Sequence, residues 1–199
     1  MIYPESMMKL IESFKKLPGI GEKTSERLAF SVLDFDQEEA ELFASSINEV
    51  KERVKECPIC HHLTEEKTCY ICQSKSRNQD ILCVVEDSKD VISLEKLGTY
   101  FGKYHVLGNL ISPSDGINPE NINIKSLIKR IEEEKTKELI LALKSTIEGE
   151  TTALYISKIL EPSKVKISKI AYGLPIGVDI EYIDALTLER ALEDRKDIG

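Results

Sequence analysis

The sequence predicts an α/β protein in which a helical N-terminal region, a small four-cysteine module, a mainly parallel sheet with helices, and a C-terminal helical segment follow one another. Three observations lead to this prediction. Apolar residues recur at helical spacing through the first 54 residues, four cysteines follow in two close pairs, and short β-rich runs then alternate with helical stretches from residue 81. Such alternation is typical of βαβ units around a parallel sheet. We expect the parts to span 1–55, 56–78, 79–172 and 173–199.

The N-terminal region is predicted to contain three helices. Apolar residues at every third position predict the first over 5–17, where a Pro-Gly step would end it. A short second helix is expected over 21–32. The third, over 36–54, is the best supported, because Asp36 and Glu39 have the spacing of a capping box and one apolar stripe runs along the helix. The stripe comprises Ala40, Phe43, Ala44, Ile47, Val50 and Val54.

The second half of the chain is predicted to form the sheet. The expected strands cover 81–86, 103–107, 138–143 and 164–172, and the expected helices between them cover 87–97, 124–134 and 151–160. The Pro- and Gly-containing stretch 112–123 is predicted to be a surface loop. A last helix is expected over 184–196. The apolar, acid-containing segment before it, 173–184, would either line a contact between subunits or cap the sheet, and residue spacing leaves both open.

Composition excludes several classes of protein. Of 199 residues, 41% are hydrophobic and 31% are charged, which is typical of a folded globular protein rather than a disordered one. Acidic residues outnumber basic ones 35 to 27, so any DNA contact must be local rather than a broad basic coat. The sequence has neither an apolar run of about 18 to 20 residues nor the pattern of a signal peptide. We therefore expect a cytoplasmic protein.

Cys57, Cys60, Cys69 and Cys72 form two C-x-x-C pairs separated by eight residues. Reducing conditions in the cytoplasm favour metal ligands or redox groups over disulfides. A redox C-x-x-C would stand alone at the start of a helix, whereas two pairs from two tight turns complete a tetrahedral zinc shell. Because four thiolates leave no open coordination position, we expect the Zn²⁺ ion to be structural.

Three other residues, His61, His62 and Cys83, are not expected to be zinc ligands. His61 and His62 follow the first cysteine pair, but the cysteines already fill the expected shell. The fifth cysteine, Cys83, lies in a predicted buried strand, where a free cysteine is usually a small apolar core residue.

The segment LPGIG, between the first two expected helices, is a candidate phosphate site. Gly19 and Gly21 allow a tight hairpin that presents backbone N–H groups beside the positive end of the second helix dipole. Lys23 and Arg27, four residues apart, share one face of that helix. The alternative is an ordinary helical corner with solvated charges. The glycine spacing fits neither the dinucleotide fingerprint nor the P-loop.

Acidic residues follow two of the expected parallel strands. Glu86 and Asp90 come after the first strand of the sheet, and Glu148 and Glu150 come after the third. Ligand sites of parallel sheets form at the carboxyl ends of the strands, and such carboxylates could hold Mg²⁺ with retained waters or bind a basic partner surface. Chance placement on polar loops is the alternative, because the chain has 35 acidic residues.

Taken in order, LPGIG, the four-cysteine module, LCVVED, EGETTALY and GLPIGVDIEY resemble the RecR family of bacterial recombination mediators over essentially the whole chain. The resemblance implies a helix-hairpin-helix element at 17–21, a zinc finger at 57–72, a Toprim domain from about residue 80 and a C-terminal segment called Walker B-like. No Walker A motif is present, so that label is no evidence for ATP hydrolysis. The chain departs from the family at one point. Family members commonly have a loop with Asn-Pro before the EGE step, whereas this chain has Leu-Lys-Ser-Thr-Ile at 143–147.

The resemblance further implies a role in recombinational DNA repair. RecR proteins work with RecO, and separately with RecF, to help load RecA on gapped DNA, and they can form ring tetramers around DNA. By this resemblance Lys23 and Arg27 would face DNA. The acids Glu86, Asp90, Glu148 and Glu150 would lie on the surface that meets RecO. We therefore expect a DNA clamp and adaptor without catalytic residues.

Two other functions remain open at this point. A Mg²⁺-dependent Toprim enzyme, nuclease-like or primase-like, would use the same acids for phosphoryl transfer. A topoisomerase would also need a nucleophilic tyrosine in an additional domain, for which 199 residues leave little room. The third possibility is a scaffold that binds RecO or RecF without binding DNA.

Overall fold

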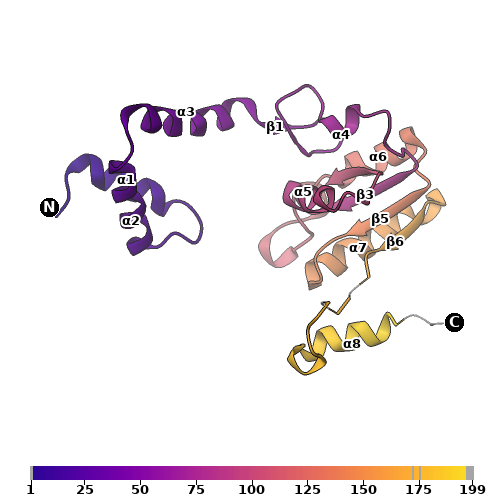
Figure 1. Cartoon of the computed structure of the whole chain (residues 1–199). Coiled ribbons are helices and arrows are strands. Elements are labelled where there is room, and N and C mark those ends of the chain that lie inside the picture. Colours follow the sequence, from indigo (N-terminus) through magenta and orange to yellow (C-terminus); the bar gives the residue numbers. More distant parts are fainter. Residues whose placement is uncertain (1, 172, 175, 196–199) are drawn as a thin grey trace. The chain divides into compact units, whose positions relative to one another are not determined.

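Two units, Met1–Val54 and Lys55–Gly199, make up the chain in a computed structural model that describes residues 2–171, 173–174 and 176–195. Figure 1 shows the order of their helices and strands. The ends of the predicted fourth strand, at 172, and of the predicted last helix, at 196, lie outside the described residues. Each unit is described by itself below.

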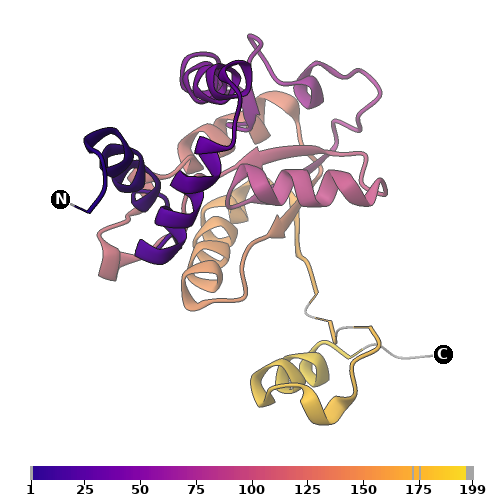
Figure 2. The same cartoon turned by 60° about the vertical axis from the view of Figure 1, so that its left-hand side comes forward.

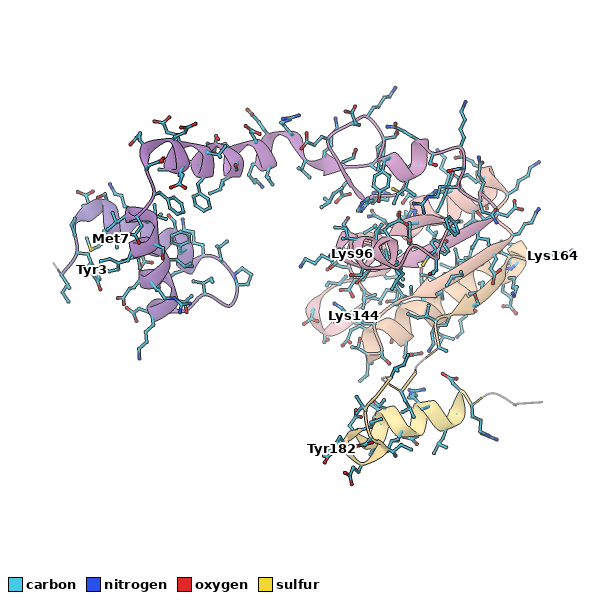
Figure 3. The ribbon with its side chains drawn as sticks, viewed as in Figure 1. Tyr3, Met7, Lys96, Lys144, Lys164 and Tyr182 are labelled. Atoms are coloured by element: carbon cyan, nitrogen blue, oxygen red, sulfur yellow. The ribbon has the colours of Figure 1, made fainter. Side chains whose placement is uncertain are left out.

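The first unit contains the three predicted helices, α1 (Glu5–Lys15), α2 (Glu22–Leu33) and α3 (Gln37–Arg53). Helices α1 and α2 pack together around the buried side chains of Met7, Ile11 and Ala29. Tyr3 stacks edge to face on Phe30, with ring centroids 5.9 Å apart. Figure 3 labels Tyr3 and Met7 in this unit.

Helix α3 begins with the predicted capping box. The Asp36 side chain accepts a hydrogen bond from Glu39 N at 2.8 Å, and the Glu39 side chain accepts one from Asp36 N at 3.1 Å. The apolar stripe along α3 is nevertheless not part of a core. No residue of α3 is buried, and Phe43, Ile47 and Val50 are 43%, 55% and 59% exposed. An apolar face of this length on a water-facing helix is typical of a surface that another molecule covers.

The second unit is built on a four-stranded parallel sheet in the order β4-β3-β5-β6, which confirms the predicted sheet. Its strands are β3 (Ile81–Val85), β4 (Lys103–Val106), β5 (Glu138–Ala142) and β6 (Lys166–Lys169). The helices that connect them are α5 (Ser88–Leu97), α6 (Ile124–Glu134) and α7 (Ile147–Leu160). Strand β6 is shorter than predicted, because a 3₁₀ turn, Glu161–Ser163, and a left-handed residue, Lys164, precede it.

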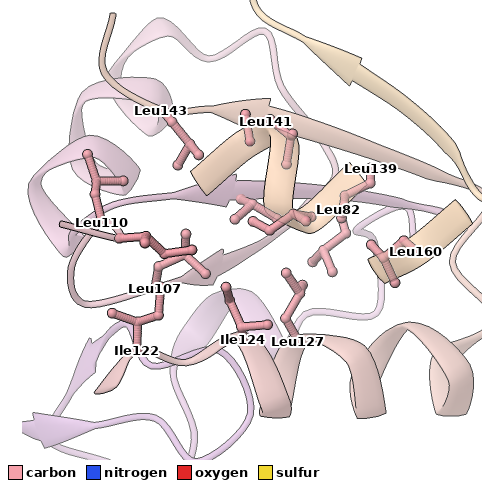
Figure 4. Close-up of a cluster of buried hydrophobic side chains, with 14 of the residues drawn as sticks. Leu82, Leu107, Leu110, Ile122, Ile124, Leu127, Leu139, Leu141, Leu143 and Leu160 are labelled. Carbon is pink, nitrogen blue, oxygen red and sulfur yellow. The ribbon is translucent and has the colours of Figure 1, made fainter. Parts of the chain in front are cut away.

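The two faces of the sheet are covered differently. Alternate residues of a strand point to opposite faces, and in β3 Leu82 and Val84 join one buried cluster while Cys83 and Val85 join another. The first cluster includes leucine and isoleucine side chains of α6 and α7 (Figure 4). The second includes Val91 of α5 and three of the paired cysteines. The sheet therefore lies between two layers, which the second view also shows (Figure 2).

Helix α7 begins at Ile147, four residues before its predicted start, so Glu148 and Glu150 lie in its first turn. Thr146 caps the helix by accepting a hydrogen bond from Gly149 N at 3.3 Å. Gly149 also permits a close approach, because a Cβ atom there would lie 1.9 Å from the carbonyl oxygen of Lys144. The glycine in the first turn therefore reflects packing against the preceding strand end, not a break in the helix.

The remaining predicted segments are largely as expected. The loop over 112–123 contains two 3₁₀ turns, Pro113–Asp115 and Pro119–Asn121, neither of which has a buried residue, although Ile122 is anchored in the core. Near the C-terminus, Asp184 caps helix α8 (Ala185–Glu193) by accepting a hydrogen bond from Thr187 N at 2.9 Å.

No helix in the described part of the chain combines the length and the apolar character that crossing a membrane requires.

Candidate functional sites

The structure brings the four predicted zinc ligands together. The sulfur atoms of Cys57, Cys60, Cys69 and Cys72 all lie within 4.8 Å of one another, and Cys60 Sγ is 3.4 Å from Cys69 Sγ. A tetrahedral shell with Zn–S bonds of about 2.3 Å has sulfur–sulfur edges of about 3.8 Å, so this cluster fits one Zn²⁺ ion. Within the described residues no histidine or carboxylate shares the cluster.

Short elements that the sequence analysis missed hold the cysteines in place. Strands β1 (Lys55–Glu56) and β2 (Leu63–Thr64) pair antiparallel around the first cysteine pair, and Cys69 precedes the single-turn helix α4 (Tyr70–Gln73). Cys57 O accepts a hydrogen bond from His61 N at 2.8 Å, which closes the first turn. His61 sits at φ 61°, a left-handed conformation that such a turn requires of its last residue. These elements carry no apolar periodicity that would reveal them.

The sulfur atoms are close enough to hydrogen-bond to one another. The pKa of Cys69 is lowered because Cys60 and Cys72 donate hydrogen bonds to its sulfur, and the pKa of Cys60 is raised by the hydrogen bond it makes to Cys69. One thiolate is therefore favoured among neighbouring thiols. Zinc binding must release the remaining protons, so zinc affinity falls as the pH is lowered.

The predicted hairpin joins α1 to α2. Gly19 has φ +79°, a left-handed conformation that favours glycine, whereas Gly21 is extended and caps α2. A Cβ atom at either glycine would meet nothing within 4 Å, so the backbone there is open to a ligand. Lys23 and Arg27 are exposed on α2, and neither forms an ion pair with any residue that the structure describes.

The predicted acids lie beside the carboxyl ends of β3 and β5, which are neighbours in the sheet. Asp90 is engaged in the cap of α5, where its side chain accepts a hydrogen bond from Asp87 N at 3.1 Å. Glu148 is partly exposed in the first turn of α7, and its pKa is lowered by hydrogen bonds from its own backbone N–H and from Thr146. Over the described residues these acids do not come together as a metal-binding group of three or more.

The sequence analysis missed the lysines that pair with two of these acids. Lys144, after β5, lies 2.9 Å from Glu86, and Lys169, at the end of β6, lies 2.9 Å from Glu150. Lys144 follows a predicted strand, like the acids themselves, whereas Lys169 lies within the predicted strand 164–172 and ends β6 in the structure. Their pairing depends on which strands are neighbours, which the order of residues along the chain does not reveal.

Comparison with known protein families agrees with this architecture. Residues 7–51 match the family model described as RecR, helix-hairpin-helix, and residues 54–74 match the model of the RecR zinc finger domain with four cysteine ligands. Residues 80–171 match Toprim domain, and residues 173–196 match RecR, C-terminal. Among curated proteins, the chain is 50% identical over 198 residues to Recombination protein RecR of Staphylococcus saprophyticus and, equally, of Staphylococcus haemolyticus. Each alignment covers 100% of both chains.

The chain belongs to the RecR family. The family resemblance and the fold class predicted from the ordered motifs are thereby confirmed, including the helix-hairpin-helix, the four-cysteine finger and the Toprim domain. The close cysteine cluster and the RecR zinc-finger match together support a structural zinc ion.

In this RecR-family chain the zinc finger shares a core with the Toprim sheet. Cys60 O accepts a hydrogen bond from Val106 N, at the end of β4, at 2.8 Å. Three of the zinc-site cysteines belong to the same buried cluster as Val85 and Tyr104 of the sheet. Arg77, which follows the finger, forms an ion pair with Glu95 on α5. The finger is thus part of the hydrophobic core of the second unit.

We predict that Cys60→Ser removes the zinc ion and destabilises the Toprim sheet. Structural zinc contributes about 10–16 kcal/mol of apparent binding free energy in small modules, and the sheet here packs on the ligands themselves. Elemental analysis should find far less than one zinc per chain. Thermal unfolding followed by circular dichroism should show a Tm lowered by about 10 °C or more.

Cys83→Ala is the matched control, because Cys83 lies in the same buried cluster but does not belong to the four-cysteine group. This variant should retain its zinc. A Cys60→Ser protein that unfolds at the temperature of the unmodified chain would contradict the shared core.

Proposed function

We propose that the chain acts in recombinational DNA repair as a non-catalytic DNA clamp and adaptor. The observation that carries the proposal is the exposed pair Lys23 and Arg27 beside an open glycine hairpin at the start of α2, in a chain of the RecR family. Backbone N–H groups and a helix N-terminus suit a DNA phosphate, and the two cations add attraction. The curated relatives carry the name Recombination protein RecR, which fits this role.

The net charge of the chain favours a weak DNA contact in each copy, so that strong DNA binding requires several copies. The formal net charge is −8, and Glu22 and Glu26 flank the two cations on α2. One hairpin therefore attracts DNA only locally and is sensitive to salt. A ring of linked copies raises the effective concentration of each site near the strand, so that retention does not depend on one strong site.

The exposed face of α3 supports assembly with further copies of the chain. The apolar stripe through Phe43, Ile47 and Val50 is exposed, while the buried cluster of this unit consists of the side chains of Met7, Ile11 and Ala29. So small a core leaves the unit marginal by itself. We infer that a second copy covers this stripe as one contact within a ring tetramer.

The acids at the carboxyl edge of the Toprim sheet suit a basic protein surface. Glu148 and Glu150 are partly exposed in the first turn of α7, and Glu86 and Asp90 are partly exposed on the same unit. We propose that this edge meets RecO, that the chain also works with RecF, and that these complexes promote RecA loading on gapped DNA. We place this activity in the cytoplasm, where bacterial chromosomal DNA lies.

The first prediction concerns DNA. Lys23→Ala/Arg27→Ala should weaken binding to labelled single-stranded and duplex DNA by about tenfold or more, because two phosphate contacts are lost from each copy that touches the DNA. The slope of log affinity against log salt should become shallower by about two for each such copy. Fluorescence anisotropy at several salt concentrations measures both quantities.

A matched pair of lysines provides the control for this experiment. Lys125 and Lys129 are also exposed and four residues apart, on α6, and their double alanine variant should bind DNA like the unmodified chain. Undiminished DNA binding by the Lys23/Arg27 variant, at unchanged oligomeric state, would remove these residues from the DNA contact.

The second prediction concerns assembly. Phe43→Glu/Ile47→Glu should lower the molar mass measured by light scattering after size-exclusion chromatography, because charges would then lie within the proposed contact. Ser45→Glu, on another face of the same helix, should leave the mass unchanged. A strictly monomeric unmodified chain, or equal masses for all three proteins, would refute the ring.

The third prediction concerns the partner. Glu148→Gln/Glu150→Gln should weaken binding to purified RecO by roughly fivefold in calorimetry, because two attractive charges are removed while side-chain shape is kept. Glu132→Gln/Glu133→Gln changes two exposed acids on α6 and is the control. If both variants bind RecO equally well, the acidic edge is not the RecO surface.

A further inference from the structure

A lysine lies where the Toprim acids would hold a cation. Strands β3 and β5 are parallel neighbours with Val85 opposite Ala142, so the residues that follow each strand lie side by side. Lys144 Nζ donates a hydrogen bond to Glu86 Oε1 at 3.0 Å and lies 2.9 Å from Glu86 Oε2. Figure 3 labels Lys144 at this edge of the sheet.

The carboxylate in this ion pair is withdrawn from water. The Glu86 side chain is 17% exposed, and its Oε2 atom is buried with no hydrogen-bond partner among the described residues. The contact with Lys144 therefore provides the counter-charge that a buried carboxylate needs. The pKa of Lys144 is raised, first by its hydrogen bond to Glu86 and then by the charges of Glu86, Asp90 and Asp87, so the amine is protonated at neutral pH.

The backbone holds Lys144 in place on both sides. Leu143, just before it, is buried in the cluster beneath α6 and α7. The carbonyl group of Lys144 packs so closely against Gly149 that any side chain there would collide with it. The backbone of Lys144 therefore has a fixed position, from which its side chain reaches Glu86.

Two other acids of this edge, Asp90 and Glu150, also have partners. Asp90 accepts a hydrogen bond from the backbone of Asp87 in the cap of α5. Glu150 accepts hydrogen bonds from Lys169 Nζ at 2.9 and 3.0 Å. Mg²⁺ binds at oxygen distances of about 2.0–2.1 Å in strict octahedral geometry and loses water reluctantly. To bind Glu86, it would have to displace the ammonium group of Lys144.

We propose that Lys144 is the resident cation of the acidic edge and that it excludes divalent metal from Glu86. The Mg²⁺ site that a Toprim fold implies therefore does not fit the residues present here. The inference rests on the ion pair and its burial, not on the proposed DNA-clamp function.

Mn²⁺ titration of the full, zinc-loaded chain, followed by the paramagnetic resonance of free Mn²⁺, tests the proposal. The unmodified chain should bind Mn²⁺ weakly. Lys144→Met, which keeps the length of the side chain, should tighten binding by roughly tenfold, because a unit positive charge leaves the immediate neighbourhood of the carboxylate. Lys144→Met/Glu86→Gln should lose this gain.

Lys137→Met is the matched control. Lys137 precedes the same strand and pairs with Asp80 at 2.7 Å, so the variant removes a more exposed lysine–carboxylate pair at the opposite end of β5. It should bind Mn²⁺ like the unmodified chain. Because Lys144→Met leaves the 17% exposed Glu86 carboxylate without its counter-charge, the Tm of this variant should fall by several degrees. Lys144→Gln serves as a second variant should the first unfold.

Two results would overturn the proposal. One is equal Mn²⁺ affinity of the unmodified chain and both Lys144 variants. The other is tight Mn²⁺ binding by the unmodified chain that Glu86→Gln abolishes. Since the assay contains neither DNA nor a partner protein, its outcome is independent of whether the clamp function is correct.

Discussion

The burial of β3 on both faces is the constraint on which the rest of the second unit depends. One face of this strand packs under α6 and α7, and the other packs on α5 and the zinc-site cysteines. Because β4 and β5 pair with it in parallel, the carboxyl ends of three strands share one edge. The same strand thus joins the zinc finger to the core and sets the position of the acidic edge. We therefore expect zinc binding at the four cysteines to stabilise the sheet as well.

Local chemistry made much of the fold predictable. Asp36 and Glu39 marked the start of α3 because a capping box needs only neighbouring residues, and alternating β-rich and helical stretches were enough for a parallel sheet. The start of α7 was predicted four residues late. There Gly149 looks like a helix breaker in sequence, but its role is to let the helix approach the Lys144 carbonyl. A close tertiary contact of this kind has no signal in residue order.

The candidate sites divide in the same way. The cysteines could be found from spacing, because two turns of the same type suffice to surround an ion. The acids were expected at one edge, and β3 and β5 do lie side by side. The lysine partners of these acids could not be predicted. Glu86 follows β3 and Lys144 follows β5, so the two residues meet only because β3 and β5 are neighbours in the sheet, and the sequence does not reveal the strand order. The apolar stripe of α3 was enough to predict the helix, but it did not reveal whether the chain itself or another molecule covers the stripe.

The contacts of the charged residues show which part of the net charge is compensated within the chain. An acidic total of −8 opposes a broad DNA-binding surface, yet part of the acidic edge is neutralised internally by Lys144 and Lys169. Lys23 and Arg27, by contrast, lie outside any ion pair with the described residues and remain available to phosphate. In the proposed ring, four copies would neutralise about eight phosphates, within the range that gives strongly salt-dependent binding. Two cations per chain are then sufficient, provided that assembly brings the copies to one strand.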